Sequence, residues 1–197
     1  MTIEPVTLEG AVVRLEPLRE SHFEALCEIG LEPELWQWTP FRVTNPEEMR
    51  AFIRAALDFQ AAGSALPFVT IHKASGRVAG STRFMNIDVP NRHLEIGSTW
   101  IGRDWRRTAV NTEAKYLMLR HAFDTLGAIR VELKTDALNQ RSRTAILRIG
   151  AQEEGIFRSH MLTWSGRRRD SVWFSIIDSE WPGVKKDLEG KLGLSEK

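Results

Sequence analysis

The sequence predicts one α/β domain built on a mixed, mostly antiparallel sheet flanked by helices. The chain has 197 residues, which is an ordinary size for a single domain. Hydrophobic residues make up 42% and charged residues 27%, which excludes the disordered and collagen-like classes. In the second half, predicted strands and helices alternate, which favours at least one crossover connection and therefore some parallel pairing.

The chain begins with a predicted strand and helix. Weak alternation of apolar residues indicates a strand at 12–18. Ser21 and Glu24 match the spacing of a capping box, which predicts a helix from Ser21 to about Ile29.

A second helix and three strands are expected next. Asn45 followed by Pro46 is a strong helix-start signal, and apolar residues then recur at helical spacing to about Ala62. Turn residues separate the following apolar runs into an antiparallel meander, with strands at 68–73, 78–87 and 93–101.

The second half of the sequence is expected to form the crossover connection and the remaining strands of the sheet. A helix is expected from Thr112 to Leu126, ended by Gly127 as a C′ residue. The remaining expected elements are a strand at 129–134, a helix from about Asn139 to Gly150, a hairpin of strands at 155–163 and 171–177, and a packed C-terminal helix carrying Trp181, Val184 and Leu188.

Charge and cysteine content exclude several functional classes. Lys and Arg number 27 against 26 Asp and Glu, and this net charge of +1 argues against a nucleic-acid partner. The single cysteine, Cys27, excludes an intrachain disulfide and a cysteine-based zinc site, and the five histidines lack metal-ligand spacing. Neither a signal peptide nor a membrane-length apolar run is evident. We therefore expect a cytoplasmic protein with no metal and no membrane partner.

A basic turn lies between the third meander strand and the next predicted helix. It contains Arg103, Arg106 and Arg107. Free N–H groups at a helix N-terminus favour an anion, and guanidinium groups add bidentate donors. The turn predicts a phosphate or pyrophosphate site, with a solvated basic turn as the alternative.

Two motifs lie in the middle and the second half of the chain. One comprises Leu94–Trp100 and Arg106–Ala114, and the other begins with Asn139-Gln140-Arg141-Ser142. Together they resemble the acetyl-CoA-binding region of the GNAT superfamily of N-acetyltransferases, in particular the branch that acetylates the N-termini of ribosomal proteins. The resemblance covers about residues 8–178. It implies a GNAT fold in one domain, 1–197, whose C-terminal tail is 179–197.

The resemblance implies transfer of acetyl from acetyl-CoA to a primary amine by direct attack in a ternary complex. The acceptor would be a protein N-terminus or a small-molecule amine. The family pattern Gln/Arg-x-x-Gly-x-Gly/Ala is altered, because Ala109 replaces the first glycine and Asn111 stands at the second small position. Asn111 would then cap the next helix or contact a phosphate. A non-catalytic CoA-binding or sensing module is the alternative function.

The resemblance also implies roles for individual residues. Glu95 is the candidate general base, with a surface or cross-strand glutamate as the alternative. Ser142 is the candidate donor to the leaving thiolate, with a helix-cap hydroxyl as the alternative. A strand N–H near Trp100 or Ile101 would stabilise the charge developing on the thioester oxygen. The expected cofactor-binding residues are Trp100, Ile101, Arg103, Arg106, Arg107, Thr108, Ala109, Val110, Asn111, Thr112, Asn139 and Ser142.

Aromatic residues between the first two helices are candidates for the acceptor pocket. GNAT folds usually line that pocket with this region, which implies Trp36, Trp38 and Phe41, and His160 is a further candidate. The alternatives are ordinary core aromatics and a structural histidine. The sequence leaves open whether the protein is a monomer or a homodimer.

Overall fold

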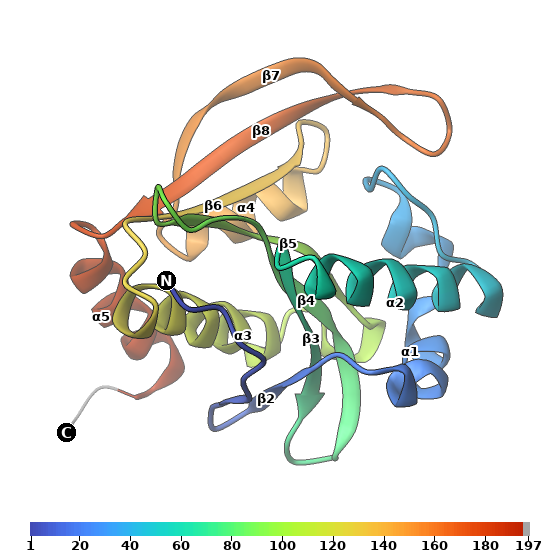
Figure 1. Cartoon of the computed structure of the whole chain (residues 1–197), viewed down its shortest axis with the longest axis horizontal. Helices are drawn as coiled ribbons and strands as arrows, with labels where there is room; N and C mark the ends of the chain where they lie inside the picture. The colour runs from blue at the N-terminus through green and yellow to red at the C-terminus, as the bar shows by residue number, and fades with distance from the viewer. Residues whose placement is uncertain (195–197) are drawn as a thin grey trace.

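The computed structural model describes residues 1–194 and contains a single eight-stranded sheet (Figure 1). Its strands are β1 (Leu8–Glu9), β2 (Val13–Pro17), β3 (Ala65–His72), β4 (Arg77–Asp88), β5 (His93–Ile101), β6 (Arg130–Asp136), β7 (Gln152–Leu162) and β8 (Arg168–Ile177). They lie in the order β1-β2-β3-β4-β5-β6-β8-β7. Only β5 and β6 pair in parallel, so the predicted mixed, mostly antiparallel sheet is confirmed.

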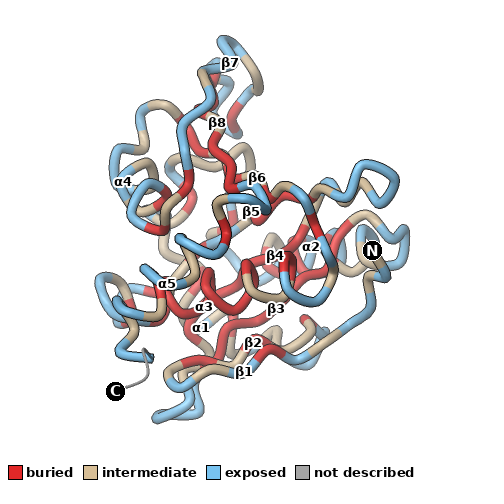
Figure 2. The backbone as a smooth tube through the Cα atoms, turned by 90° about the vertical axis from the view of Figure 1, so that its left-hand side faces the viewer, coloured by how far each residue is buried: buried red, intermediate tan, exposed pale blue. Residues whose placement is uncertain are grey.

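Helices cover both faces of the sheet and enclose two cores. The helices are α1 (Phe23–Gly30), α2 (Pro46–Ala61), α3 (Ala109–Arg120), α4 (Gln140–Arg148) and α5 (Trp181–Leu192). One core includes residues of α3 and α5, and the other packs α1 and α2 against β3 and β5. Burial is concentrated around α3, β3 and β4 (Figure 2). In the β7–β8 hairpin, which projects away, β7 is largely exposed whereas most of β8 is buried. None of the described helices is long and apolar enough to cross a membrane.

Local sequence signals set several helix ends. Asn45 caps α2 by accepting the Glu48 N–H at 2.9 Å, as its sequence predicts. Asn139 likewise caps α4. Gly127 ends the helical segment that follows α3 in the left-handed conformation, with φ of 66°, a position suited to glycine. These predicted boundaries are confirmed to within a few residues.

Two predicted helix starts are wrong. Ser21 lies within a short helical turn, Glu20–His22, and α1 begins only at Phe23, without a side-chain cap. The ring nitrogen Nδ1 of His22 accepts the Arg19 N–H instead, at 3.1 Å. The helix expected from Thr112 begins three residues earlier, at Ala109.

Thr108, and not Asn111, caps α3. Its hydroxyl accepts the Val110 N–H at 3.3 Å and donates to the Trp105 carbonyl at 2.7 Å. The Trp105 carbonyl becomes available because a helical turn, Arg103–Trp105, precedes the cap. This tertiary arrangement decides between two residues that are both able to cap a helix.

The buried carboxylate of Glu113 ties α3 to the first two strands. It accepts the backbone N–H groups of Ala11, Val12 and Val13 at 2.9, 2.7 and 2.6 Å. A Cβ at Gly10 would lie 2.5 Å from this carboxyl group, so the turn between β1 and β2 requires a glycine. Glu113 thereby satisfies three donors that the turn leaves without backbone partners.

We expect Glu113→Ala to lower the free energy of unfolding by about 3 kcal/mol, because it leaves three N–H groups unpaired. Urea unfolding measures the change. The matched control is Glu28→Ala, at an exposed site on α1, for which a change below about 0.5 kcal/mol is expected. Equal losses in the two variants would contradict the assignment.

Candidate active site

The parallel strands β5 and β6 pair over only three residues. The pairs are His93↔Arg130, Leu94↔Val131 and Glu95↔Glu132. β5 continues to Ile101 without a partner on the β6 side, while β6 continues to pair with β8 (Figure 1). The sheet therefore opens between β5 and β6 from Glu95 onward.

A β-bulge reshapes β5 within this opening. Ser81 pairs with Trp100 and Arg83 pairs with Gly97, so β5 holds one residue more than β4 over this stretch. Ser98, with φ of 47°, lies in the left-handed region, where non-glycine residues are uncommon. Backbone groups of Ser98 and Thr99 are released from regular pairing at the place where the sheet opens.

Lys115, on α3, forms hydrogen bonds with residues at the bulge. Its ammonium group donates to the hydroxyl of Thr99 at 2.6 Å and to that of Thr82 at 3.3 Å. Burial lowers the pKa of Lys115 to about 7, because the charged form is poorly solvated there. The shape of β5 thus depends on a lysine that is close to half neutral at physiological pH.

The loop between β5 and α3 forms an anion-binding geometry. Arg107 is left-handed, with φ of 62°, and Thr108 then begins the helix. Ala109 is helical, so it needs none of the conformational freedom of glycine. The side-chain oxygen of Asn111 is buried and has no hydrogen-bond partner among the described residues. The first turn of α3 therefore offers free N–H groups and an unsatisfied amide to a ligand.

The three arginines of the loop have different surroundings. The guanidinium groups of Arg103 and Arg106 lie 3.7 to 3.9 Å from the carboxylates of Glu32 and Glu34. Arg106 also donates to the Ile101 carbonyl at 3.3 Å, which anchors the loop to β5. Arg107 is exposed and forms no ion pair with the described residues. It is the loop cation most available to an anion.

The start of α4 lies at the end of the other strand that borders the opening. Asn139 accepts the Ser142 N–H at 3.1 Å, so its side-chain oxygen serves the helix cap. Ser142 is half-buried, and its hydroxyl has no hydrogen-bond partner within the described part of the chain. This hydroxyl remains free for a ligand.

Glu95 lies where β5 and β6 separate and is 2% exposed. Its Oε2 accepts hydrogen bonds from Asn86 Nδ2 at 2.7 Å and from Lys134 Nζ at 2.6 Å. Its Oε1 lies beside Gly97, 3.0 Å from where a Cβ would be. One carboxylate oxygen is thus held by the protein, and the other points along β5 toward the bulge.

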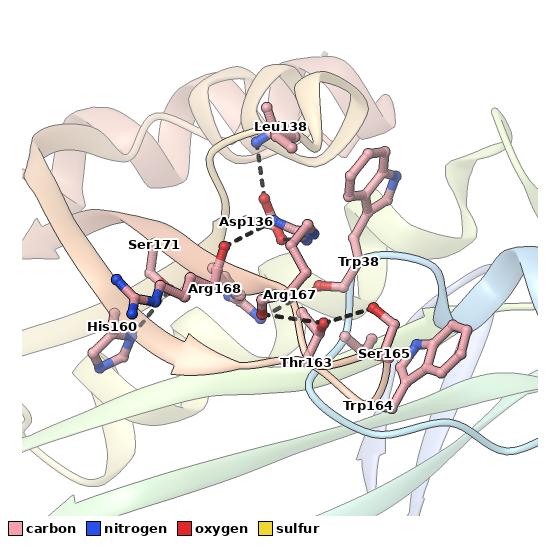
Figure 3. A network of polar contacts seen from close by, with 12 residues as sticks. Trp38, Asp136, Leu138, His160, Thr163, Trp164, Ser165, Arg167, Arg168 and Ser171 are labelled. Atoms are coloured by element: carbon pink, nitrogen blue, oxygen red, sulfur yellow. Dashed lines mark hydrogen bonds and ion pairs between the residues drawn. The ribbon is translucent and has the colours of Figure 1, made fainter.

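His160 is turned toward the same charged region by an irregular hairpin. Between the pairs Phe157↔Ser171 and Met161↔Arg169, β7 holds two more residues than β8. The ring nitrogen Nδ1 of His160 lies 3.0 Å from Ser171 Oγ (Figure 3). Burial and nearby cations lower the pKa of His160, which favours its neutral form at pH 7. It also borders an open depression in the hairpin.

The segment between α1 and α2 packs against the hairpin tip (Figure 3). Trp164 Nε1 donates to the Trp36 carbonyl at 3.1 Å, and Arg169 donates to the Trp38 carbonyl at 3.3 Å. The Trp36 ring is fully buried and contacts Phe41 at a centroid distance of 5.6 Å. The structure thus places Trp36 in the core instead of in a pocket wall, whereas Trp38 is partly exposed at the contact with the hairpin.

Two buried cations, Arg83 and Lys115, escaped the sequence reasoning. Arg83 carried a usable signal, because a charge near the centre of a meander strand expected to be covered by helices requires a partner or a ligand. Lys115 carried none, since its burial depends on how α3 packs against the distant strands β4 and β5.

The lowered pKa of Lys115 predicts a pH dependence of stability. Between about pH 7 and pH 10, the unfolded chain keeps this proton while the folded chain has lost it, so raising the pH favours folding. We expect the free energy of unfolding of the wild type, measured relative to Lys115→Met, to increase from pH 7 to pH 9.5. Urea titrations at each pH measure it, and a pH-independent difference would contradict the assignment.

Comparisons with known proteins agree with this geometry. A family model described as an acetyltransferase (GNAT) domain matches residues 13–152. The crystal structure of a GCN5-related N-acetyltransferase from Brucella melitensis is 36% identical and superimposes with a TM-score of 0.88, over 95% of this chain and 86% of that chain.

Two curated bacterial proteins are also similar. "Uncharacterized N-acetyltransferase p20" of Bacillus licheniformis is 29% identical over 92% of this chain and its own full length. "Putative ribosomal N-acetyltransferase YdaF" of Bacillus subtilis (strain 168) is 33% identical over 56% of this chain and 59% of its own. The predicted resemblance and the expected fold are confirmed: the chain belongs to the GNAT family of acetyltransferases.

Proposed function

We propose that the protein transfers an acetyl group from acetyl-CoA to a primary amine by direct attack in a ternary complex. Membership of the GNAT family supports acetyl transfer from acetyl-CoA. The observation that carries the proposal is the opening between β5 and β6 beyond Glu95, with α3 following one strand and α4 the other. Acetyl-CoA supplies an activated thioester, so no covalent enzyme intermediate is required.

The residues of the opening fit such a co-substrate. The N–H groups at the start of α3 and the side chain of Arg107 bind the pyrophosphate. Asn111 offers a buried amide that lacks a protein partner, and rotation of this amide presents its NH₂ group to a phosphate. Backbone groups of Trp100 and Ile101, in the part of β5 that lacks a β6 partner, bind the pantetheine arm and the thioester oxygen.

Residues that lie near the amine acceptor transfer the proton. An amine attacks only in its neutral form, so it needs a base at neutral pH. Glu95 Oε1 and neutral His160 are the two candidate bases, and Lys134 orients the glutamate by binding Oε2. As the new C–N bond forms and the C–S bond breaks, the proton of the amine passes to the base. Ser142 then hydrogen-bonds the departing thiolate.

The acceptor is a protein N-terminus or a small-molecule amine. The name of YdaF refers to ribosomal substrates, which supports including protein N-termini among the acceptors to be tested. We propose a cytoplasmic location. We also propose that the chain is one domain, because the eight described strands form a single sheet.

Calorimetric titration with acetyl-CoA tests the cofactor site. We expect saturable binding, and a rise in Kd of about tenfold or more for Arg107→Glu, since this change reverses the charge at the start of α3. Arg54→Glu makes the same charge change on the exposed face of α2 and should leave Kd unchanged. Absence of binding in the wild type would refute the proposed function.

Release of free CoA thiol with a panel of amines tests catalysis. Glu95→Gln should lower kcat by about 100-fold while leaving the Kd for acetyl-CoA unchanged, because general bases contribute on this order. His160→Gln, if this residue is the base, should instead remove the lower limb of the pH–rate profile. Binding of acetyl-CoA without turnover of any amine would indicate the alternative, a non-catalytic CoA-binding module.

A further inference from the structure

Arg83 lies on the face of the sheet that carries Glu95. It pairs across the strands with Gly97, and residues opposite each other in an antiparallel pair point to the same face. A Cβ at Gly97 would touch Glu95 Oε1, which places positions 95 and 97 on that face as well. Arg83 therefore lies one diagonal step from the candidate base, where the sheet opens.

Among the described residues, the guanidinium group of Arg83 has no hydrogen-bond or ion-pair partner for its charge. The residue is 6% exposed, and its Nε is buried without a hydrogen-bond acceptor among the described residues. No carboxylate of residues 1–194 lies within ion-pair distance of Arg83, and its guanidinium carbon lies 5.1 Å from the centroid of the Phe52 ring. Burial lowers the pKa of Arg83 to about 10, so the group stays charged at pH 7. An unpaired buried charge is costly unless a ligand completes it.

Arg169 is a second buried cation, and no carboxylate of residues 1–194 lies within ion-pair distance of it, although the charges of Asp136 and Glu95 act on it from farther away. It is 6% exposed and donates only to neutral oxygens, Ser171 Oγ at 3.1 Å and the Trp38 carbonyl at 3.3 Å. Two neighbouring basic residues do have partners: Lys134 is paired with Glu95, and Arg167 is paired with Asp136. The charges of Arg83 and Arg169 are therefore the two in this region that no carboxylate among the described residues neutralises.

Both unpaired cations border the same part of the molecule. Arg169 binds the carbonyl of Trp38 directly. Arg83 lies over Phe52, whose ring contacts Trp36 and Phe41 at centroid distances of 5.7 and 5.6 Å. Arg169 thus contacts the segment between α1 and α2 from β8, and Arg83, on β4, lies over a ring of α2 that packs against the same segment. Both residues lie on the face of the sheet that carries Glu95.

We propose that the amine acceptor carries a carboxylate close to its amino group, and that Arg83 and Arg169 bind this carboxylate. The inference rests on the proposed function and specifies its substrate class. Guanidinium groups bind carboxylates in a bidentate manner, which would orient the amine as well as hold it. An acceptor with additional positive charge, such as a polyamine, is disfavoured by the same two cations. The carboxylate belongs either to a free amino acid or to an acidic first residue of a peptide.

Matched acceptors test the proposal by release of CoA thiol. Glycine against glycinamide probes the α-carboxylate, and Asp-Ala-amide against Asn-Ala-amide probes an acidic side chain. We expect at least a tenfold advantage in kcat/KM for the carboxylate member of one pair. Arg83→Met and Arg169→Met should abolish this advantage, mainly through KM, while Arg54→Met on the exposed face of α2 should retain it. The Kd for acetyl-CoA, unchanged in each variant, shows that the fold is intact.

The outcomes separate this inference from the proposed function. Turnover of the neutral or cationic acceptors with equal or greater efficiency would overturn the inference and leave the acetyltransferase proposal standing. If no amine is turned over, calorimetry of the CoA-loaded protein still tests the preference for a carboxylate. The ligand pairs are then N-acetylglycine against N-acetylglycinamide, and N-acetyl-Asp-Ala-amide against N-acetyl-Asn-Ala-amide. A preference for the carboxylate that is lost in Arg83→Met would support it, and equal binding within both pairs would refute it.

Discussion

The site depends on one constraint: β5 and β6 stop pairing after Glu95 and Glu132. Parallel strands that remained paired to their ends would close the sheet and leave no room between α3 and α4. Here β6 continues with β8, and β5 turns through a bulge at Ser98, so the two strands separate. The bulge is held in turn by Lys115, which reaches it from α3. The opening is thus a product of strand pairing and one buried lysine.

The two sides of the opening differ in their chemistry. On the α3 side, free helix N–H groups and Arg107 present positive charge to a phosphate at the surface. On the hairpin side, the two buried carboxylates are each bound by a basic residue: Glu95 by Lys134, and Asp136 by Arg167. Such buried pairs add little net stability but fix geometry, because breaking one leaves an uncompensated charge. This arrangement suits a face that orients an acceptor and moves a proton.

Local sequence signals predicted the frame of the molecule well. The caps Asn45 and Asn139 were predictable because capping depends on neighbouring residues, and the limits of β5 followed from turn residues on either side. The predictions failed where contacts between residues far apart in the sequence determine the local structure. Thr108 displaced Asn111 as a cap because a helical turn places the Trp105 carbonyl beside it.

The same distinction applies to the site residues. The position of Glu95 at the end of the β5–β6 pairing follows from topology, but its ion pair with Lys134 depends on the relative register of two strands far apart in the sequence. Trp36 resembled a pocket residue in the sequence, and only packing against α2 and β5 shows that it belongs to the core. The unpaired state of Arg83 likewise becomes visible only when all surrounding elements are in place.

Backbone hydrogen exchange with and without acetyl-CoA tests the central claim, that the opening between β5 and β6 is the cofactor site. We predict slower exchange at Ser98–Ile101, at Arg107–Asn111 and at the start of α4, because a ligand there binds N–H groups that lack protein partners. The β7–β8 hairpin should exchange at the same rate in both states. Protection confined to the hairpin, or saturable binding that leaves the starts of α3 and α4 unprotected, would contradict the account.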